Sequence, residues 1–368
     1  MDGDSDTESD IYSVRSGLPP PSESDMSMAS SLTSYEVDPS IRSASPQSVF
    51  SVTDSMQANF QRQEYGRGLQ TYSELYRLPA DEEELERLDK QHTIFVDLMG
   101  EKYVPPMESV MADDVPGETK ACLDLGCGSG SWIMDVARDF PHCSAVAVDL
   151  IPMQSPSEVD DVNLGLEHFY GDFNVVHARL ISSGIKDYHL LVDQMCRALR
   201  PHGLLDISEF DFHIYDKDHK RIELGTHEIA PPWWARWMTF LAASIKHIGG
   251  DADAATHLLE WVSSNPSFED VVYREFWLPI VPPPYSPTES EATRRFYRKM
   301  KENTSAFLGA GRPLLLGSDL PVELVDTLEQ GALREMDERK ITQYTRLQCV
   351  YARKKSTLDA NWMRAPKN

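Results

Sequence analysis

Paired cysteines and metal-binding spacings are absent from this sequence. The chain of 368 residues has five cysteines, none in a C-x-x-C pair or in a cysteine–histidine cluster with the spacing of a zinc site. We therefore expect no metal site. An odd number of cysteines in so long a chain also argues against a disulfide framework, so we expect a reducing, intracellular compartment, cytoplasmic or nuclear.

Basic residues are scarce. Lysine and arginine number 35 against 59 aspartates and glutamates, which gives a formal net charge of -24. Such a chain repels nucleic acid and anionic membrane surfaces, so we expect neither as a direct partner. The cluster RRFYRKMK, Arg294 to Lys301, is a local exception. A solvated helix face explains it better than a weak nuclear-import or partner patch.

Long apolar runs are also lacking. The N-terminus MDGDSDTESD has neither the basic start nor the apolar stretch of a signal peptide. The longest apolar run, Trp233 to Ile245, is too short to span a bilayer and contains Arg236. For its three tryptophans we favour core packing over an aromatic acceptor pocket or a partner surface.

Residues 1–60 have few of the large apolar side chains that a core needs. Stretches such as SGLPPPSESD and SIRSASPQS are rich in Ser, Asp and Pro, which predicts a disordered tail. After it, YRLPADEEELERLDKQHTIFVDLMG predicts a capped helix. Asp81 and Glu84 have the spacing of a capping box, and Gly100 is a stop signal.

Strand-like and helix-like segments then alternate. KACLDL, SAVAVDL, FNVVHARLI and GLLDISEF are strand-like, whereas SWIMDVARDF and DYHLLVDQMCRALRPHG are helix-like. This alternation predicts an α/β fold with a mostly parallel sheet and helices on both faces. DVVYREFWLPI and ITQYTRLQCVYARK predict late strands, and residues 291–308 and 322–339 predict helices between them.

Three glycines at alternate positions follow the first strand, in LDLGCGSGSW. A dinucleotide-binding loop needs glycines at positions one, three and six, but with Gly126 as position one the sixth position is Ser131. A phosphate-binding P-loop needs a lysine, which is missing here. The pattern present is Asp-x-Gly-x-Gly-x-Gly, from Asp124 to Gly130.

That pattern resembles motif I of the class I S-adenosylmethionine-dependent methyltransferases. The resemblance implies S-adenosyl-L-methionine as the cofactor, with the loop against its methionine part and Asp124 orienting its ammonium. Glycines let the backbone approach closely, and the following helix N-terminus offers free N–H groups. The resemblance implies a cofactor site that includes Asp124, Gly126, Cys127, Gly128, Gly130, Asp149, Leu150 and His177.

Two acidic positions extend this resemblance. Asp149 ends SAVAVDL, where the family places the acid that accepts both ribose hydroxyls, although an ordinary strand-end acid is the alternative. In SEVDDVN, Asp160 or Asp161 is a candidate for reading the adenine amino group, and a solvated turn acid explains either one equally well.

Several segments narrow the resemblance to fungal LaeA-like methyltransferases, among them YRLPADEEELERLDKQH, LDLGCGSG, VDLIPMQ and LRPHGLLDISEFD. The resemblance covers roughly Tyr65 to Lys354. It implies a seven-stranded Rossmann-like sheet with an antiparallel last strand, and a lid helix near Tyr76 to Met99. The implied organisation is a lid region at 61–110, a methyltransferase domain at 111–354 with a helical insertion near 285–340, and a C-terminal tail at 355–368.

The sequence between Asp149 and Phe173 is short for the helix, strand and helix that the family places there. We therefore expect a truncated third strand and a weakened adenine pocket. By family position, residues 177–179 lie beside the transferred methyl group. For His177 itself, a satisfied half-buried histidine is an equal alternative.

Methyl transfer needs a general base only when the acceptor must lose a proton. The candidates for that role, besides His177, are Glu209, Asp211 and His213 in EFDFHIYD. Alternation along an extended segment places these three on one side. The face of a surface hairpin is the alternative, and for His213 the preferred one, since DKDHK has the composition of a turn.

Three functions are compatible with these features. The first is methylation of a small-molecule or protein acceptor, in or regulating secondary metabolism. The second is a catalytically weak, cofactor-binding regulator that acts through protein partners. The third, a nicotinamide-dependent oxidoreductase, is disfavoured by the glycine register.

Overall fold

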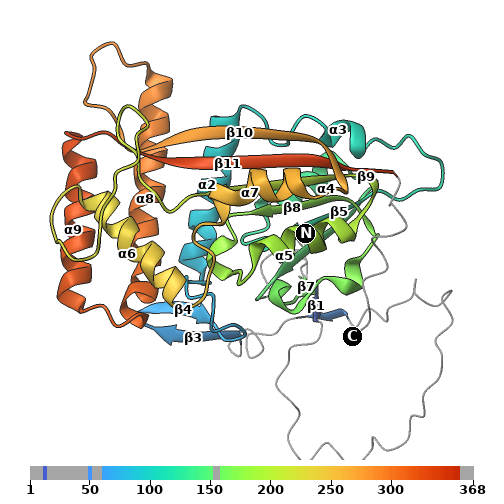
Figure 1. The fold of residues 1–368 in the computed structure, drawn as a ribbon, viewed down its shortest axis with the longest axis horizontal. Helices are drawn as coiled ribbons and strands as arrows, with labels where there is room; N and C mark the ends of the chain where they lie inside the picture. The colour runs from blue at the N-terminus through green and yellow to red at the C-terminus, as the bar shows by residue number, and fades with distance from the viewer. Residues whose placement is uncertain (1–10, 15–48, 52–59, 152–157, 357–368) are drawn as a thin grey trace, which may run out of the picture.

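Among the described residues, the main sheet has nine strands in the order β10-β11-β9-β8-β5-β6-β7-β1-β2 (Figure 1). The computed structural model describes residues 11–14, 49–51, 60–151 and 158–356. The five central strands are parallel: β5 (Ala121–Leu125), β6 (Ser144–Asp149), β7 (Glu158–Val159), β8 (Phe173–Arg179) and β9 (Leu199–Phe210). The last strand, β11 (Gln343–Lys354), runs antiparallel between β9 and β10 (Phe268–Val281). The seven strands from β10 to β7 in this order form the predicted mostly parallel sheet with an antiparallel last strand, which is therefore confirmed.

Two strands come from the region predicted to be a disordered tail. β1 (Ile11–Val14) pairs in parallel with β7 and antiparallel with β2 (Val49–Ser51). Their sequences, IYSV and VFS, contain the aromatic and β-branched residues that favour strands. The rest of that prediction concerns residues outside the described part of the chain, and the predicted domain boundaries stay predictions.

Helices cover both faces of the sheet, as predicted. On one face, α3 (Met107–Val110) and α4 (Ser131–Asp139) pack on Cys122, Val175 and Leu204. On the other, α5 (Tyr188–Ala198) and α7 (Ala254–Ser264) pack on Leu123, Val176 and Leu205. This leaves the carboxyl ends of the parallel strands as the edge where a ligand site is expected.

Beyond those carboxyl ends lies a helical layer made of α2 (Glu82–Met99), α6 (Trp233–His247), α8 (Glu291–Gly317) and α9 (Val322–Glu338), seen at the left of Figure 1. Trp234 and Trp237 are buried in its core, as the packing interpretation predicted. The first of the two predicted late helices, α8, continues past its predicted end at Leu308. Three buried leucines beyond Pro313 stabilise that extension, and Gly311 lets Trp237 pack directly on the helix.

The predicted lid helix starts later than expected. Residues 76–80 are not helical, because Pro79 lies in that stretch. A short hairpin of β3 (Gln61–Glu64) and β4 (Arg67–Gln70) comes first, and α2 begins at Glu82. Asp81 caps α2 by accepting from the Glu84 N–H at 3.0 Å. The second half of the capping box is missing, because the Glu84 carboxylate pairs with Arg87.

In the part of the segment after Asp149 that the structure describes, regular structure is scarce, in line with the predicted truncation of the third strand. The third parallel strand, β7, has two residues, and the 3₁₀ turns Val162–Leu164 and Glu167–Phe169 follow it. Between residues 158 and 172 there is no α-helix. The described residues that directly follow β7 are therefore built mainly as turns.

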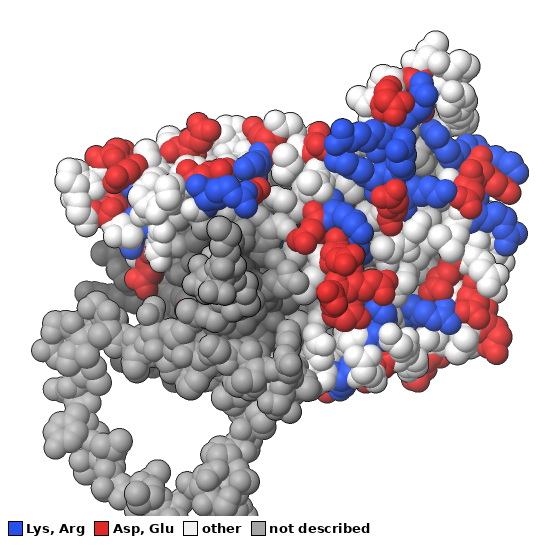
Figure 2. All heavy atoms as spheres, turned by 180° about the vertical axis from the view of Figure 1, so that it is seen from behind, with Lys and Arg blue, Asp and Glu red and all other residues white. Residues whose placement is uncertain are grey.

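The basic cluster at residues 294–301 lies on α8. Arg298 reaches Glu291 at 3.8 Å, Lys299 reaches Asp97 at 2.6 Å, and Lys301 pairs with Asp337. Figure 2 shows lysines and arginines gathered in a patch at the upper right of the face seen from behind, with acids around it. These pairings favour the solvated helix face. In the described part of the chain, no helix is long and apolar enough to cross a membrane.

Candidate functional site

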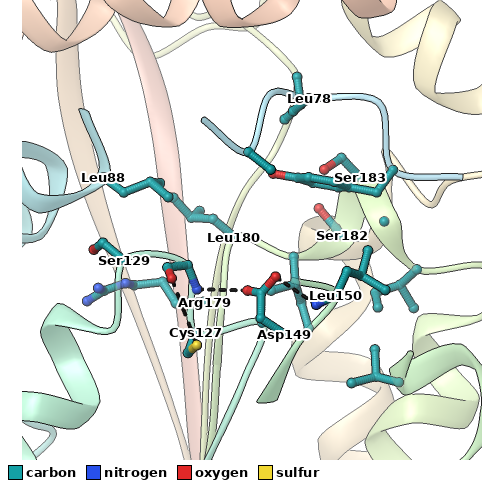
Figure 3. A pocket seen from close by; sticks show the side chains of 18 of the residues that line it. Leu78, Leu88, Cys127, Ser129, Asp149, Leu150, Arg179, Leu180, Ser182 and Ser183 are labelled. Atoms are coloured by element: carbon teal, nitrogen blue, oxygen red, sulfur yellow. Dashed lines mark hydrogen bonds between the residues drawn. The ribbon is translucent and has the colours of Figure 1, made fainter. Parts of the chain in front are cut away.

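A cavity lies at the carboxyl ends of β5, β6, β7 and β8, beneath α2 (Figure 3). It holds ≈ 1390 Å³ of empty space, part of it open to solvent. The predicted cofactor residues that line it are Asp124, Gly126, Cys127, Gly128, Asp149, Leu150, Asp160, Asp161 and His177. Gly130 does not line it and instead forms the N-cap of α4. The structure thus brings nearly the whole predicted set together.

The glycine loop makes two close approaches. Gly126 has φ 65°, and a Cβ there would lie 2.4 Å from Cγ2 of Ile181. Gly128 has φ 58°, and a Cβ there would lie 3.0 Å from Cδ1 of Leu88 on α2. Both positions therefore require glycine, for backbone conformation and for space.

Asp149 ties the end of β6 to this loop. Its Oδ2 accepts from the Gly128 N–H at 2.9 Å and its Oδ1 from the Leu150 N–H at 2.8 Å (Figure 3). Burial raises its pKa to about 6, against the lowering effect of these backbone donors. A carboxylate oxygen can accept more than one hydrogen bond, so both oxygens keep capacity for adjacent hydroxyl donors on a ligand.

Three buried polar residues form a row across neighbouring strands. Asp124 on β5 is aligned with His177 on β8, which is aligned with Asp206 on β9. Burial raises the pKa of Asp124 to about 6, while His177 and Arg179 act to lower it. Among the described residues, no side chain or backbone group forms a hydrogen bond with the Asp124 carboxylate, which faces the cavity.

His177 is held on two sides. Its Nδ1 lies 3.0 Å from Oδ2 of Asp206, and its ring stacks on Trp132 at a centroid distance of 3.7 Å. Within the described chain, its Nε2 is buried without a hydrogen-bond partner. Sequence reasoning missed Asp206 and Trp132, although an acid inside the apolar strand GLLDISEF was a usable signal.

A chain of polar contacts fastens α2 over the cavity. Arg179 Nη2 donates to His92 Nδ1 at 3.1 Å, and His92 Nε2 lies 3.1 Å from Oδ2 of Asp135 on α4. Since arginine only donates, His92 is neutral with its proton on Nε2. Burial, and then the Arg179 charge, lower the pKa of His92. These contacts join α2 to both α4 and β8.

Asp160 and Asp161 follow β7, as predicted for residues near adenine. Oδ2 of Asp160 lies 3.2 Å from Nε2 of His168. Oδ1 of Asp161 accepts from the backbone N–H of Asn163 at 2.9 Å and from its Nδ2 at 2.8 Å. Both acids therefore shape the turn, and adenine recognition by either stays a prediction.

Of the three predicted base candidates on β9 and beyond, only Glu209 lines the cavity. Its carboxylate accepts from Ile181 N–H at 2.8 Å, Ser182 Oγ at 2.9 Å and the Tyr188 hydroxyl at 2.9 Å. Burial raises its pKa to about 7, despite these donors. Glu209 thus anchors the loop after β8 in the cavity wall.

Asp211 and His213 require a correction, because neither lines the cavity. β9 ends at Phe210, so the alternation does not continue. The Asp211 carboxylate instead accepts from Arg346 at 2.8 Å and from the Tyr215 hydroxyl at 2.7 Å. The half-buried His213 precedes a tight hairpin in which Tyr215 pairs with Arg221, as the hairpin alternative predicted.

Comparisons with known proteins agree with this geometry. A family model described as a methyltransferase domain matches residues 107–266. The chain is 51% identical over 306 residues to the secondary metabolism regulator laeA of Coprinopsis cinerea, covering 81% of this chain and 75% of that protein. It is 28% identical over 272 residues to methyltransferase str2 of Strobilurus tenacellus, covering 71% and 88%.

A solved structure of Haemonchus contortus phosphoethanolamine N-methyltransferase 2 aligns with a TM-score of 0.37 and 14% identity, over 73% of this chain and 57% of that one. The fold and the domain match define a class I S-adenosylmethionine-dependent methyltransferase, whose cofactor is S-adenosyl-L-methionine. The chain belongs to the LaeA-like family of fungal methyltransferases.

Proposed function

We propose that this protein binds S-adenosylmethionine beneath α2 and transfers its methyl group to a small-molecule or protein acceptor, in or regulating fungal secondary metabolism. The observation that carries the proposal is the Asp149 carboxylate bonded to the Gly128 N–H at the cavity edge. The name of the Coprinopsis relative, a secondary metabolism regulator, supports the biological setting. Residence in the cytoplasm or nucleus stays a prediction.

The residues fit the parts of this cofactor. Asp149 has spare acceptor capacity for two ribose hydroxyls, and Asp124 presents an unpaired carboxylate for an ammonium. The glycine loop leaves room for the methionine part, where a Cβ would collide. When bound, S-adenosylmethionine supplies a methyl group activated by its sulfonium.

The chain itself then contributes alignment and exclusion of water. The contacts of Arg179, His92 and Asp135 hold α2 over the cavity and limit solvent entry. Glu209 is occupied by its donors, which leaves His177 as the base candidate for an acceptor that must lose a proton.

A second candidate function is a catalytically weak regulator that binds the cofactor and acts through protein partners. The two-residue strand β7 beside the adenine side of the cavity favours it, because a short strand gives that side less support.

Turnover separates the two candidates. Wild-type protein would be incubated with S-adenosylmethionine and fractionated fungal extract, and S-adenosylhomocysteine would be quantified by mass spectrometry. The proposal predicts product only when protein and an acceptor fraction are both present, and none with Gly128→Val. Cofactor binding without product in any fraction would favour the regulator, and absence of cofactor binding would contradict both.

A further inference from the structure

A second, smaller chamber adjoins the cofactor cavity. It lies between α2, α6 and α8 and the strands β10 and β11, and holds ≈ 510 Å³ of empty space, part of it open. Its wall is mainly apolar and includes Phe95, Trp234, Met238, Ile280, Met300 and Leu347. These residues come from five elements that meet beyond the sheet's carboxyl edge, at the left of Figure 1.

The chamber communicates with the cofactor cavity. Gln91, Phe210 and Phe307 line both spaces. These three are half-buried, whereas every other residue of the chamber wall is buried. Phe210 and Phe307 meet edge-to-face at 6.1 Å. These three residues are therefore the least enclosed part of the chamber wall, and they lie on the side of the cofactor cavity.

No charged or titratable side chain lines the chamber in the described part of the chain. Its polar groups are Gln91, Asn303, Thr304, Thr345 and the indole N–H of Trp234, which is buried without a hydrogen-bond partner among the described residues. A charged group entering such a space loses hydration and gains no partner, which costs several kcal/mol or more. The chamber therefore selects against ammonium and carboxylate groups.

We propose that this chamber binds the body of the methyl acceptor, a small, uncharged, largely apolar or aromatic molecule. The inference rests on the proposed function and gives it a substrate class. The reactive atom lies at the mouth formed by Gln91, Phe210 and Phe307, where it faces the cofactor. The lysine and arginine side chains of proteins are excluded as acceptors because they carry charge.

The transfer balances as a displacement at carbon. A lone pair of the acceptor atom forms the new bond to the methyl carbon, and the S–CH₃ bond electrons return to sulfur. The sulfonium becomes the neutral thioether S-adenosylhomocysteine. An acceptor hydroxyl releases its proton to water or to His177, the base candidate in the cofactor cavity.

The test uses wild-type protein saturated with S-adenosylhomocysteine and three probes of one shape. These are 1-naphthol, 1-naphthoate and 1-naphthylmethylammonium, titrated by calorimetry. We expect 1-naphthol to bind at least about tenfold more tightly than either charged probe. Equal or tighter binding of a charged probe, or no binding of 1-naphthol, would overturn the chamber proposal and leave the cofactor site standing.

A variant locates the binding. Ile280→Phe fills the chamber, so we expect about tenfold weaker 1-naphthol binding and cofactor-product affinity unchanged within about twofold. Ile245→Phe, at a buried isoleucine that lines neither space, is the matched control.

Naphthol binding unchanged by Ile280→Phe overturns the proposal. If Ile280→Phe fails to fold, the three-probe comparison decides alone. If S-adenosylhomocysteine does not bind wild type, the proposed function fails and the chamber proposal with it.

Discussion

At the scale of single residues, the site depends on carboxylates that differ in how many hydrogen bonds they accept from the chain itself. Asp149 holds the glycine loop and keeps capacity for ligand hydroxyls, whereas Glu209 is committed to the loop after β8. The same chemical group, a carboxylate, thus has two roles, set by how many donors surround it.

Replacing Asp149 tests the first role. We expect Asp149→Ala to lower S-adenosylmethionine affinity by about 10–100-fold, because hydrogen bonds to a charged acceptor are lost. In wild type, the affinity should fall as the pH drops through about 6, since the protonated carboxyl accepts fewer hydrogen bonds. Calorimetry across that range measures both effects. Asp172→Ala, at an exposed acid outside the cavity, is the control, and equal affinities for the two variants would refute the role.

A glycine pair tests the loop geometry. Gly126→Ala forces a Cβ against Ile181 at a positive φ, so we expect it to lower the free energy of unfolding by about 2 kcal/mol or more. Gly309→Ala, in α8 with open space around the new Cβ, should raise it by up to about 1 kcal/mol. Urea denaturation compares them, and equal effects would contradict the close approach.

Local patterns predicted the glycine loop and Asp149 because both lie within one βαβ unit, from β5 through α4 to β6. Asp206, Trp132 and Arg179 were harder to assign, since each acts through contacts made across separate strands or helices. The alternation argument failed at Asp211 because it assumed an extended chain past Phe210, where the strand ends.

At the scale of elements, α2 is the part that closes the cavity, and His92 joins it to α4 and β8. The folded protein lowers the pKa of His92, so the unfolded chain binds that proton more tightly. The contribution of His92 is therefore present above its unfolded pKa of about 6.5 and is lost as the pH falls below it. The groups that face it are Arg179, Asp135 and His177.

His92→Gln keeps polar character and removes the titration. We expect the stability advantage of wild type over this variant to shrink as the pH is lowered from about 8 to about 5. Urea denaturation of both proteins across that range isolates His92 from other titrating groups such as Glu209. An advantage that does not change with pH would rule the mechanism out.

The start of α6 depends on a side chain from α9. Glu335 accepts from the Trp233 N–H at 2.6 Å and the Trp234 N–H at 2.9 Å, which are free donors at the helix N-terminus. Glu335→Ala should lower the free energy of unfolding by about 1–2 kcal/mol. Glu338→Ala, at an exposed pair with Lys340, should change it by less than about 0.5 kcal/mol. Thermal or urea unfolding tests this, and similar losses would contradict the capping role.

At the scale of the whole molecule, the sheet presents one edge to both spaces, the cofactor cavity and the smaller chamber. The βα alternation predicted that edge, because parallel strands place their carboxyl ends together. The chamber was not predictable, since its wall joins Phe95, Trp234, Ile280, Met300 and Leu347 from distant parts of the chain. Only packing of the helical layer brings them together.

Calorimetric titration with S-adenosylmethionine and S-adenosylhomocysteine tests the central claim most directly. We predict micromolar binding by wild type and by Gly309→Ala. Gly128→Val should not bind, because its side chain would meet Leu88 at a position with φ 58°. Absence of binding by wild type, or unchanged affinity in Gly128→Val, would contradict the assignment of this cavity to the cofactor.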